Sequence, residues 1–162
     1  MSHPSTADVV RGVLQHYASR GTFRSFSEVP GRRGRIAFRF LWYRDITIAL
    51  EFDPATGTLV FRHLLPGVPA RSAMDREVRA YVAGRSARSV REHRRVDRRK
   101  VGVKCLNRGG ALSVVVTLKR AHADYGARKA VHLVHDILID FLSDGQYAQY
   151  QIEHLNLDPE RA

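Results

Sequence analysis

The residues best suited to chemistry in this sequence are arginines, and they cluster between residues 85 and 100. The chain has 27 basic residues, of which 23 are arginine, and its net charge is +11. The 85–100 segment alone carries +6, because only Glu92 and Asp97 oppose its cations. Guanidinium groups bind carboxylates and phosphates through paired hydrogen bonds. The basic residues of this candidate site are Arg85, Arg88, Arg91, Arg94, Arg95, Arg98, Arg99 and Lys100.

Two interpretations of this basic segment remain open. Such a charge favours acidic partners, which include nucleic acid, an acidic protein face and anionic lipid. The same residues are also compatible with a solvated surface in a chain that uses arginine in place of lysine. Arg32, Arg33 and Arg35 form a candidate second patch in a glycine-containing loop. Three-residue spacing would wind the arginines of 85–94 around a helix, so this segment is expected to be an exposed helical extension or a mobile loop.

A histidine and carboxylate cluster near the end of the chain raises the question of a metal site. His132, His135, Asp136 and Asp140 have spacings at which ligands can share one side of a helix. A helical projection instead spreads them from the apolar boundary across the polar face, and one helix cannot close a metal shell alone. We therefore predict a solvent face with an ion pair of Asp136 to Lys129 or His132, and no metal ligands.

The remaining residue types do not form a catalytic set. Cys105 is the only cysteine, so an internal disulfide and a CxxC motif are both excluded. A nucleophilic thiol needs a base and some exposure, whereas Cys105 alternates with polar residues in a row that should be buried. We predict that the chain is not an enzyme and uses no cofactor. A deep polar cleft with clustered, perturbed side chains would be needed to support an enzyme instead.

Hydrophobic periodicity predicts the elements that position these residues. Alternation with period two is typical of strands, and recurrence every three to four residues is typical of helices. Residues 23–34 have neither pattern and are expected to form a basic, flexible loop. The predicted helices lie at 6–20, 73–82 and 124–142, and the predicted strands lie at 36–42, 46–52, 59–63, 101–105 and 112–118.

These elements predict an α+β fold with a single antiparallel five-stranded sheet, helices packed on one face, and the order α-β-β-β-α-β-β-α. Short connections make the strands antiparallel neighbours. The aromatic row that includes Phe38, Phe40 and Trp42 is expected to form the core rather than a platform for stacking nucleic acid bases. The opposite row mixes polar and apolar residues, and such a face can contact a partner or a second copy of the chain.

The length of 162 residues fits one domain, 1–162, with an arginine-rich connection at 85–100 and a C-terminal helical tail at 146–162. No apolar stretch is long enough to span a bilayer, so no membrane association is expected. The N-terminus lacks the pattern of a signal peptide. A cytoplasmic location is the resulting expectation.

The element order resembles the type III secretion chaperone-like fold and, within it, the YbjN family of small bacterial proteins. The resemblance covers about residues 5–143. It implies a non-enzymatic, often dimeric protein that engages other polypeptides, and it carries over no site residue. It rests on Leu41-Trp-Tyr, Thr47-Ile-Ala-Leu, Tyr81-Val-Ala-Gly-Arg-Ser-Ala87, the Val101–Leu118 hairpin and the Val131–Leu142 helix.

Together these observations predict a non-enzymatic, chaperone-like module that binds another, acidic protein, with a homodimer as one arrangement. The alternative is a nucleic-acid-associated basic module that uses residues 85–100. Phosphate neutralisation would then make its affinity fall steeply with salt.

Overall fold

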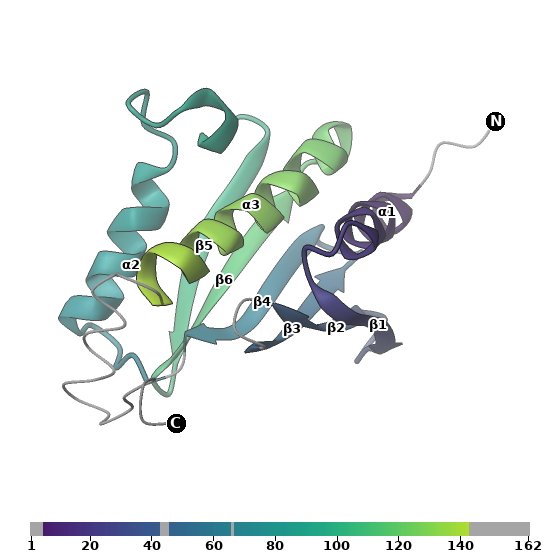
Figure 1. The fold of residues 1–162 in the computed structure, drawn as a ribbon, viewed down its shortest axis with the longest axis horizontal. Coiled ribbons are helices and arrows are strands. Elements are labelled where there is room, and N and C mark those ends of the chain that lie inside the picture. The colour runs from purple at the N-terminus through teal and green to yellow at the C-terminus, as the bar shows by residue number, and fades with distance from the viewer. Residues whose placement is uncertain (1–4, 43–45, 66, 143–162) are drawn as a thin grey trace.

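A computed structural model describes residues 5–42, 46–65 and 67–142 of the chain (Figure 1). The C-terminal tail predicted at 146–162 lies outside the described residues. The elements, in chain order, are α1 (Thr6–Ser19), β1 (Arg24–Pro30), β2 (Ile36–Trp42), β3 (Ile46–Asp53), β4 (Thr58–Leu65), α2 (Ala73–Gly84), the 3-10 turn η2 (Glu92–Arg94), β5 (Val101–Arg108), β6 (Ala111–Leu118), the 3-10 turn η3 (Arg120–His122) and α3 (Ala123–Leu142).

The strands form one antiparallel sheet in the order β1-β2-β3-β4-β6-β5. The predicted α+β class and antiparallel sheet are therefore confirmed. The predicted strand count of five is wrong, because β1 pairs with β2 and adds a sixth strand at the edge. The order of elements accordingly becomes α-β-β-β-β-α-β-β-α.

Strand β1 falls inside the segment that was expected to be a loop. The sequence of this strand has no period-two pattern, because few of its side chains are buried. It is an edge strand with exposed residues at five of its seven positions, and its register slips between Arg24 and Ser27. Ser25 in that slip has a φ of 54°, which is left-handed backbone. Its main apolar anchor is Phe26, whose ring stacks on that of Phe38 at 5.7 Å. Tertiary pairing with β2 therefore defines this strand, since its own sequence carries no period-two signal.

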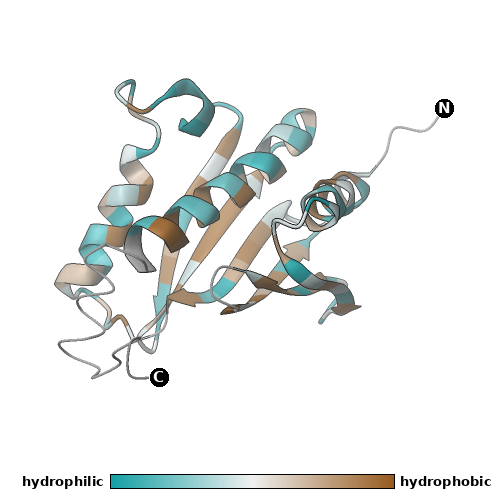
Figure 2. Ribbon diagram, viewed as in Figure 1, coloured by the Kyte–Doolittle hydropathy of each residue, from teal (hydrophilic) through white to brown (hydrophobic). Residues whose placement is uncertain are grey.

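All three helices lie on one side of the sheet, with α3 across its middle and α2 beside β5 (Figure 1). Phe38, Phe40, Phe52 and Phe61 point to this side and are at most 2% exposed, which confirms the predicted core row. Burying each such side chain contributes about 1.5–3 kcal/mol. Figure 2 shows the matching pattern, with hydrophobic bands on the strands and hydrophilic residues on the outer sides of the helices.

Hydroxyl caps begin two of the helices. Ser5 Oγ accepts a hydrogen bond from the Asp8 amide at 3.1 Å, and Ser72 Oγ accepts one from the Asp75 amide at 3.1 Å. Such caps satisfy amides that have no partner within the helix. In α3, Asp124 lies in the first turn, where it pairs with Arg128 at 2.9 Å.

None of the described helices lies over the other face of the sheet. One row across it runs from Ala37 through Glu51, Val60 and Val115 to Lys104, which matches the mixed composition expected from the alternation. Arg62 hydrogen-bonds to Glu51 and, with Arg35, holds the pKa of that carboxyl below its usual value. An antiparallel sheet can leave one such face in water. Among the described helices, none is both long and apolar enough to cross a bilayer.

Candidate anion-binding site

Residues 85–100 form a closed loop that connects α2 to β5 (Figure 1). Its anchor is Val96, which is 5% exposed and whose amide donates to the Arg85 carbonyl at 3.0 Å. Two successive turns, Ala87 to Gly84 and Val90 to Ala87, precede the 3-10 turn η2. The segment is therefore a loop with successive turns and not the helical extension, which was one of the two forms predicted for it.

Asp136 on α3 holds this loop to the helical layer. Its Oδ2 atom accepts from Arg85 Nη2 at 3.0 Å and from Arg94 Nε at 3.1 Å. Arg94 also reaches Asp140 at 3.7 Å, and Tyr81 of α2 donates to the same Asp140 carboxylate. Since the Arg85 and Asp136 side chains are only 11% and 17% exposed, Arg85 serves the fold and is not available to a ligand. Arg94 is 39% exposed, and its guanidinium group is paired with both carboxylates.

The ion pairs predicted for Asp136 are therefore wrong, although His132 and Asp140 are exposed as the predicted solvent face requires. Among the described residues, Asp136 pairs with arginines of the distant loop and forms no ion pair with Lys129 or His132. Lys129 Nζ instead donates to the His93 carbonyl at 2.7 Å, and His132 Nε2 lies 3.0 Å from the Tyr17 hydroxyl. Helical projection missed this because it considers one helix alone, whereas the partners come from another part of the chain.

Two arginines of the loop are held in place by neutral acceptors. Arg95 donates to the carbonyls of Arg88 and Val90 at 2.9–3.2 Å. Arg98 donates to Ser86 Oγ at 3.1 Å and to the Ala83 carbonyl at 2.8 Å. Carbonyl and hydroxyl groups have no net charge, so both guanidinium groups are oriented without being neutralised. In the part of the chain that the structure describes, the Nη1 group of each has no partner.

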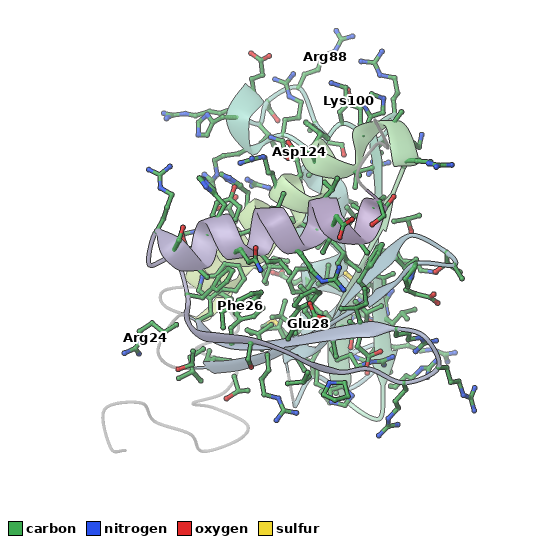
Figure 3. All side chains as sticks on the ribbon, turned by 90° about the vertical axis from the view of Figure 1, so that its right-hand side faces the viewer. Arg24, Phe26, Glu28, Arg88, Lys100 and Asp124 are labelled. Carbon is green, nitrogen blue, oxygen red and sulfur yellow. The ribbon has the colours of Figure 1, made fainter. Side chains whose placement is uncertain are left out.

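These arginines face a hollow of about 600 Å³ between the loop and α3, which we call the basic hollow. Two acidic residues also line it, Glu92 and Asp97, which leaves a net charge of +4. Figure 3 shows Arg88 and Lys100 together at this end of the molecule. The basic lining residues are Arg88, Arg95, Arg98, Arg99, Lys100 and Lys129.

Tyr125 of α3 lies between two of these cations. Lys100 Nζ is 4.9 Å and Lys129 Nζ is 5.6 Å from the centre of its ring, distances typical of cation–π contacts. The Tyr125 hydroxyl accepts from the Asp97 amide at 3.1 Å and so ties α3 to the loop. Burial lowers the pKa of Lys129. Sequence reasoning missed Tyr125 as a site residue, although its spacing of four from Lys129 places both on one side of the helix.

The acidic residues that line the hollow neutralise only some of its basic residues. Asp97 accepts from the amide, Nε and Nη2 of Arg99 at 3.0–3.3 Å, and these bonds lower the pKa of its carboxyl. Arg99 is thereby paired although its side chain is 91% exposed. Arg88 and Lys100 have no carboxylate partner among the described residues. The charges open to a ligand therefore belong to Arg88, Arg95, Arg98, Lys100 and Lys129.

The predicted site residues separate into three groups. The basic hollow brings together five of them, whereas Arg85 and Arg94 bind Asp136, and Arg91 is exposed outside the lining. The second patch of Arg32, Arg33 and Arg35 does not join it. That loop connects β1 and β2, four strand intervals from β5 or about 19 Å away. Arg35 is moreover paired with Glu51 at 3.5 Å and with Asp53 at 3.7 Å.

The other candidates for chemistry lie elsewhere. Cys105 is 7% exposed, which confirms its predicted place in the core, and burial raises its pKa to about 11. A thiol with this pKa is almost wholly protonated at neutral pH and is a weak nucleophile. Among the described residues, no three His, Cys, Asp or Glu side chains are grouped so that they could hold a metal ion.

Comparison with known proteins gives this chain no family. No family model matches it, and neither does any curated protein or solved structure. The resemblance to the chaperone-like fold remains a prediction, and a function has to be argued from the residues themselves.

Proposed function

We propose that this protein is a non-enzymatic binding module that takes an acidic segment of another protein into the basic hollow. The observation that supports it is the convergence of oriented, uncompensated cations on one concave site with a net charge of +4. Because the donor groups of the site are already held in place, less side-chain entropy is lost when a ligand binds. Arginine is also the residue best suited to pair with carboxylates in a fixed geometry.

The form of the site favours an acidic polypeptide over nucleic acid. Single-stranded nucleic acid is bound by grooves that follow its backbone and by aromatic side chains on which bases stack. Here the large aromatic side chains Phe38, Phe40, Phe52, Phe61 and Trp42 are at most 6% exposed. The compact hollow fits a short acidic segment better than it fits a nucleotide strand. Nucleic acid remains the second candidate because Arg88 and Arg91 of the same loop are exposed.

Homodimerisation, the other part of the prediction, would use the uncovered face of the sheet. That face carries Arg39, Arg62 and Lys104 in addition to apolar residues, and Glu51 already pairs with Arg62 at 3.0 Å. Two copies placed face to face would repel each other, since the electrostatic free energy of like charges rises as they approach. A dimer of this kind is therefore expected to strengthen with salt in sedimentation or light-scattering measurements, because salt screens that repulsion.

Fluorescence anisotropy with a labelled acidic peptide tests the main proposal. The protein should bind a short peptide of aspartate and glutamate at low salt, with affinity that falls as salt rises. The double variant Arg88→Gln/Lys100→Gln should lose most of this affinity, because it removes two cations that line the hollow. Neither side chain donates a hydrogen bond to another described residue, so the fold should be unaffected.

The matched control is Arg32→Gln/Arg33→Gln, which removes the same charge from the far edge of the sheet. Equal losses from both double variants would mean that only net charge matters and would contradict a defined site. Tighter binding to a single-stranded oligonucleotide of equal charge than to the peptide would replace this proposal by the nucleic acid alternative.

A further inference from the structure

We propose that the basic hollow binds a phosphate monoester, so that the preferred partner segment carries a phosphorylated residue beside acidic ones. This inference rests on the proposed function, because it names the anion that occupies the same hollow. Three properties of the site support it: its charge density, the directions of its donors, and the state of its own carboxylates.

The charge density of the hollow exceeds what ordinary acidic residues can match. A sphere of the hollow's volume is roughly 10 Å across and holds about three residues of an extended chain, which advances about 3.3 Å per residue. Successive side chains of such a chain point to opposite sides, so only one or two carboxylates would face the cations. A phosphorylated residue brings about 1.5–2 negative charges in a single group. One phosphate with neighbouring carboxylates therefore approaches the net charge of +4.

The donors reach the hollow from two elements. Arg95, Arg98 and Lys100 come from separate positions of the loop, and Lys129 comes from α3. A carboxylate presents two oxygens in one plane, whereas a phosphate monoester presents three oxygens around a tetrahedral phosphorus. Donors that converge from several directions are therefore better satisfied by a phosphate.

The free hydrogen-bonding groups of these donors are already oriented. Arg95 and Arg98 use Nε and Nη2 to hold backbone and hydroxyl oxygens, and each keeps Nη1 for a ligand in the described part of the chain. Lys100 and Lys129 stand against one tyrosine ring, with no carboxylate hydrogen-bonded or ion-paired to either ammonium group among the described residues. An anion between such cations relieves their mutual repulsion. Clusters of arginine are a common means of recognising phosphorylated motifs.

The carboxylate of Asp97 does not occupy the anion position. Its two oxygens already accept three hydrogen bonds from Arg99, whose side chain points into solvent. Glu92 is exposed, with no hydrogen bond or ion pair from its side chain among the described residues. The hollow therefore has cations that its own acidic residues leave unsatisfied.

The test compares two acidic peptides of the same total charge. One contains phosphoserine among aspartates, and the other replaces it by aspartate and adds a glutamate at the peptide end. The phosphopeptide should bind about tenfold more tightly, which corresponds to about 1.4 kcal/mol. Phosphorus NMR gives a second readout, since bound cations should lower the second pKa of the phosphate from its usual value of about 6.

The outcomes separate this inference from the proposed function. Equal affinity for the two peptides would overturn the phosphate preference and leave the acidic-segment proposal standing. No binding of either peptide at low salt would overturn both. If O-phosphoserine or inorganic phosphate alone bound as tightly as the phosphopeptide, the site would be one for free phosphate, and a phosphorylated segment would be the wrong partner.

Variants locate the phosphate within the hollow. Lys100→Gln should reduce phosphopeptide affinity and also reduce the downward shift of the phosphate pKa, whereas Arg33→Gln should change neither. Among the described residues, the Lys100 ammonium group has no hydrogen bond or ion pair and lies over the Tyr125 ring, so circular dichroism should show an unchanged fold. An unchanged phosphate pKa shift in Lys100→Gln would contradict the assignment of the hollow as the phosphate site.

Discussion

Replacing Asp136 by asparagine removes the charge that holds the arginine-rich loop to α3 while keeping the shape of the side chain. Asp136 Oδ2 is shared by Arg85 at 3.0 Å and Arg94 at 3.1 Å. Without the carboxylate, Arg85 keeps a positive charge in a site where its side chain is 11% exposed. Its Nε atom already has no hydrogen-bond partner among the described residues. The substitution therefore leaves a nearly buried cation without a counter-charge.

The size of the effect follows from the burial of each partner. Removing one member of a buried ion pair costs about 3–5 kcal/mol, and exposed pairs contribute only about 0–1 kcal/mol. The Arg85 pair lies near the buried limit, whereas Arg94 is 39% exposed and also contacts Asp140 at 3.7 Å. Asparagine keeps one oxygen that can accept a hydrogen bond. We therefore expect Asp136→Asn to lower the free energy of unfolding by about 2–3 kcal/mol.

Urea unfolding measures this loss directly. The urea concentration at the unfolding midpoint should fall. The slope of the free energy of unfolding against urea concentration should change little, because the surface exposed on unfolding stays the same. The matched control is Asp124→Asn, which breaks an exposed pair with Arg128 at 2.9 Å and should cost less than about 0.5 kcal/mol. If Asp136→Asn were as mild as Asp124→Asn, the loop would not depend on this carboxylate and the reasoning would be wrong.

The same variant connects stability to binding. Lys129 and Tyr125 stay on α3, but the loop that brings Arg95 and Arg98 towards them would lose its ion pairs with Asp136. Asp136→Asn should therefore weaken acidic-peptide binding, although it removes a negative charge and makes the protein more basic. Stronger binding would show that net charge and not loop geometry determines affinity.

Two further predictions concern acid stability and the turns. The pKa values of Glu51 and Asp75 are lowered in the folded state, so their stabilisation is complete above the unfolded values near 4 and is lost as the pH falls through the folded values. Burial also lowers the pKa of His132, so protonation of this ring already costs some stability as the pH falls below about 6.5. Urea midpoints should therefore fall slightly between pH 7 and about pH 5 and further below about pH 4, and a profile that stays flat from pH 5 to about pH 3 would contradict this expectation. Gly31→Ala should destabilise the protein by about 2 kcal/mol or more, because the added Cβ would lie 1.9 Å from the Arg35 carbonyl oxygen, whereas Gly12→Ala in α1 has open space and should stabilise by about 0.5–1 kcal/mol in the same assay. Equal effects of the two glycine substitutions would rule out the close contact at the β1–β2 turn.

The strands with strong alternation could be predicted from the sequence because half of each strand is buried. In β2 and β3, and in β4 as far as Phe61, the buried positions recur every second residue. A strand shows this pattern when one face of its sheet is covered and the other is solvated. Strand β1 could not be predicted in this way, since an edge strand with a register slip has little burial to alternate. Its identity depends on β2, which supplies both its hydrogen bonds and the ring against which Phe26 stacks.

The sequence showed the excess of basic residues that forms the candidate site, but it did not show how their side chains are arranged. The excess of arginine at 85–100 is a property of the sequence, and five of its residues do line the basic hollow. The sequence near an arginine does not decide whether its charge is available to a ligand. That depends on whether folding places a carboxylate or a neutral acceptor next to the guanidinium group. Arg85 and Arg98 have the same side chain, yet one pairs with Asp136 and the other with a serine hydroxyl and a carbonyl.

By itself, the sequence determined the α+β class, most of the strands, the aromatic core and the sign of the charge, because each depends on residue type and short-range period. Only the tertiary structure decided the sixth strand, the role of Asp136 and the presence of Tyr125 and Lys129 beneath the loop. The physical reason is distance along the chain. Electrostatic and edge-strand contacts join residues tens of positions apart, and their energies depend on burial that exists only after the chain has folded.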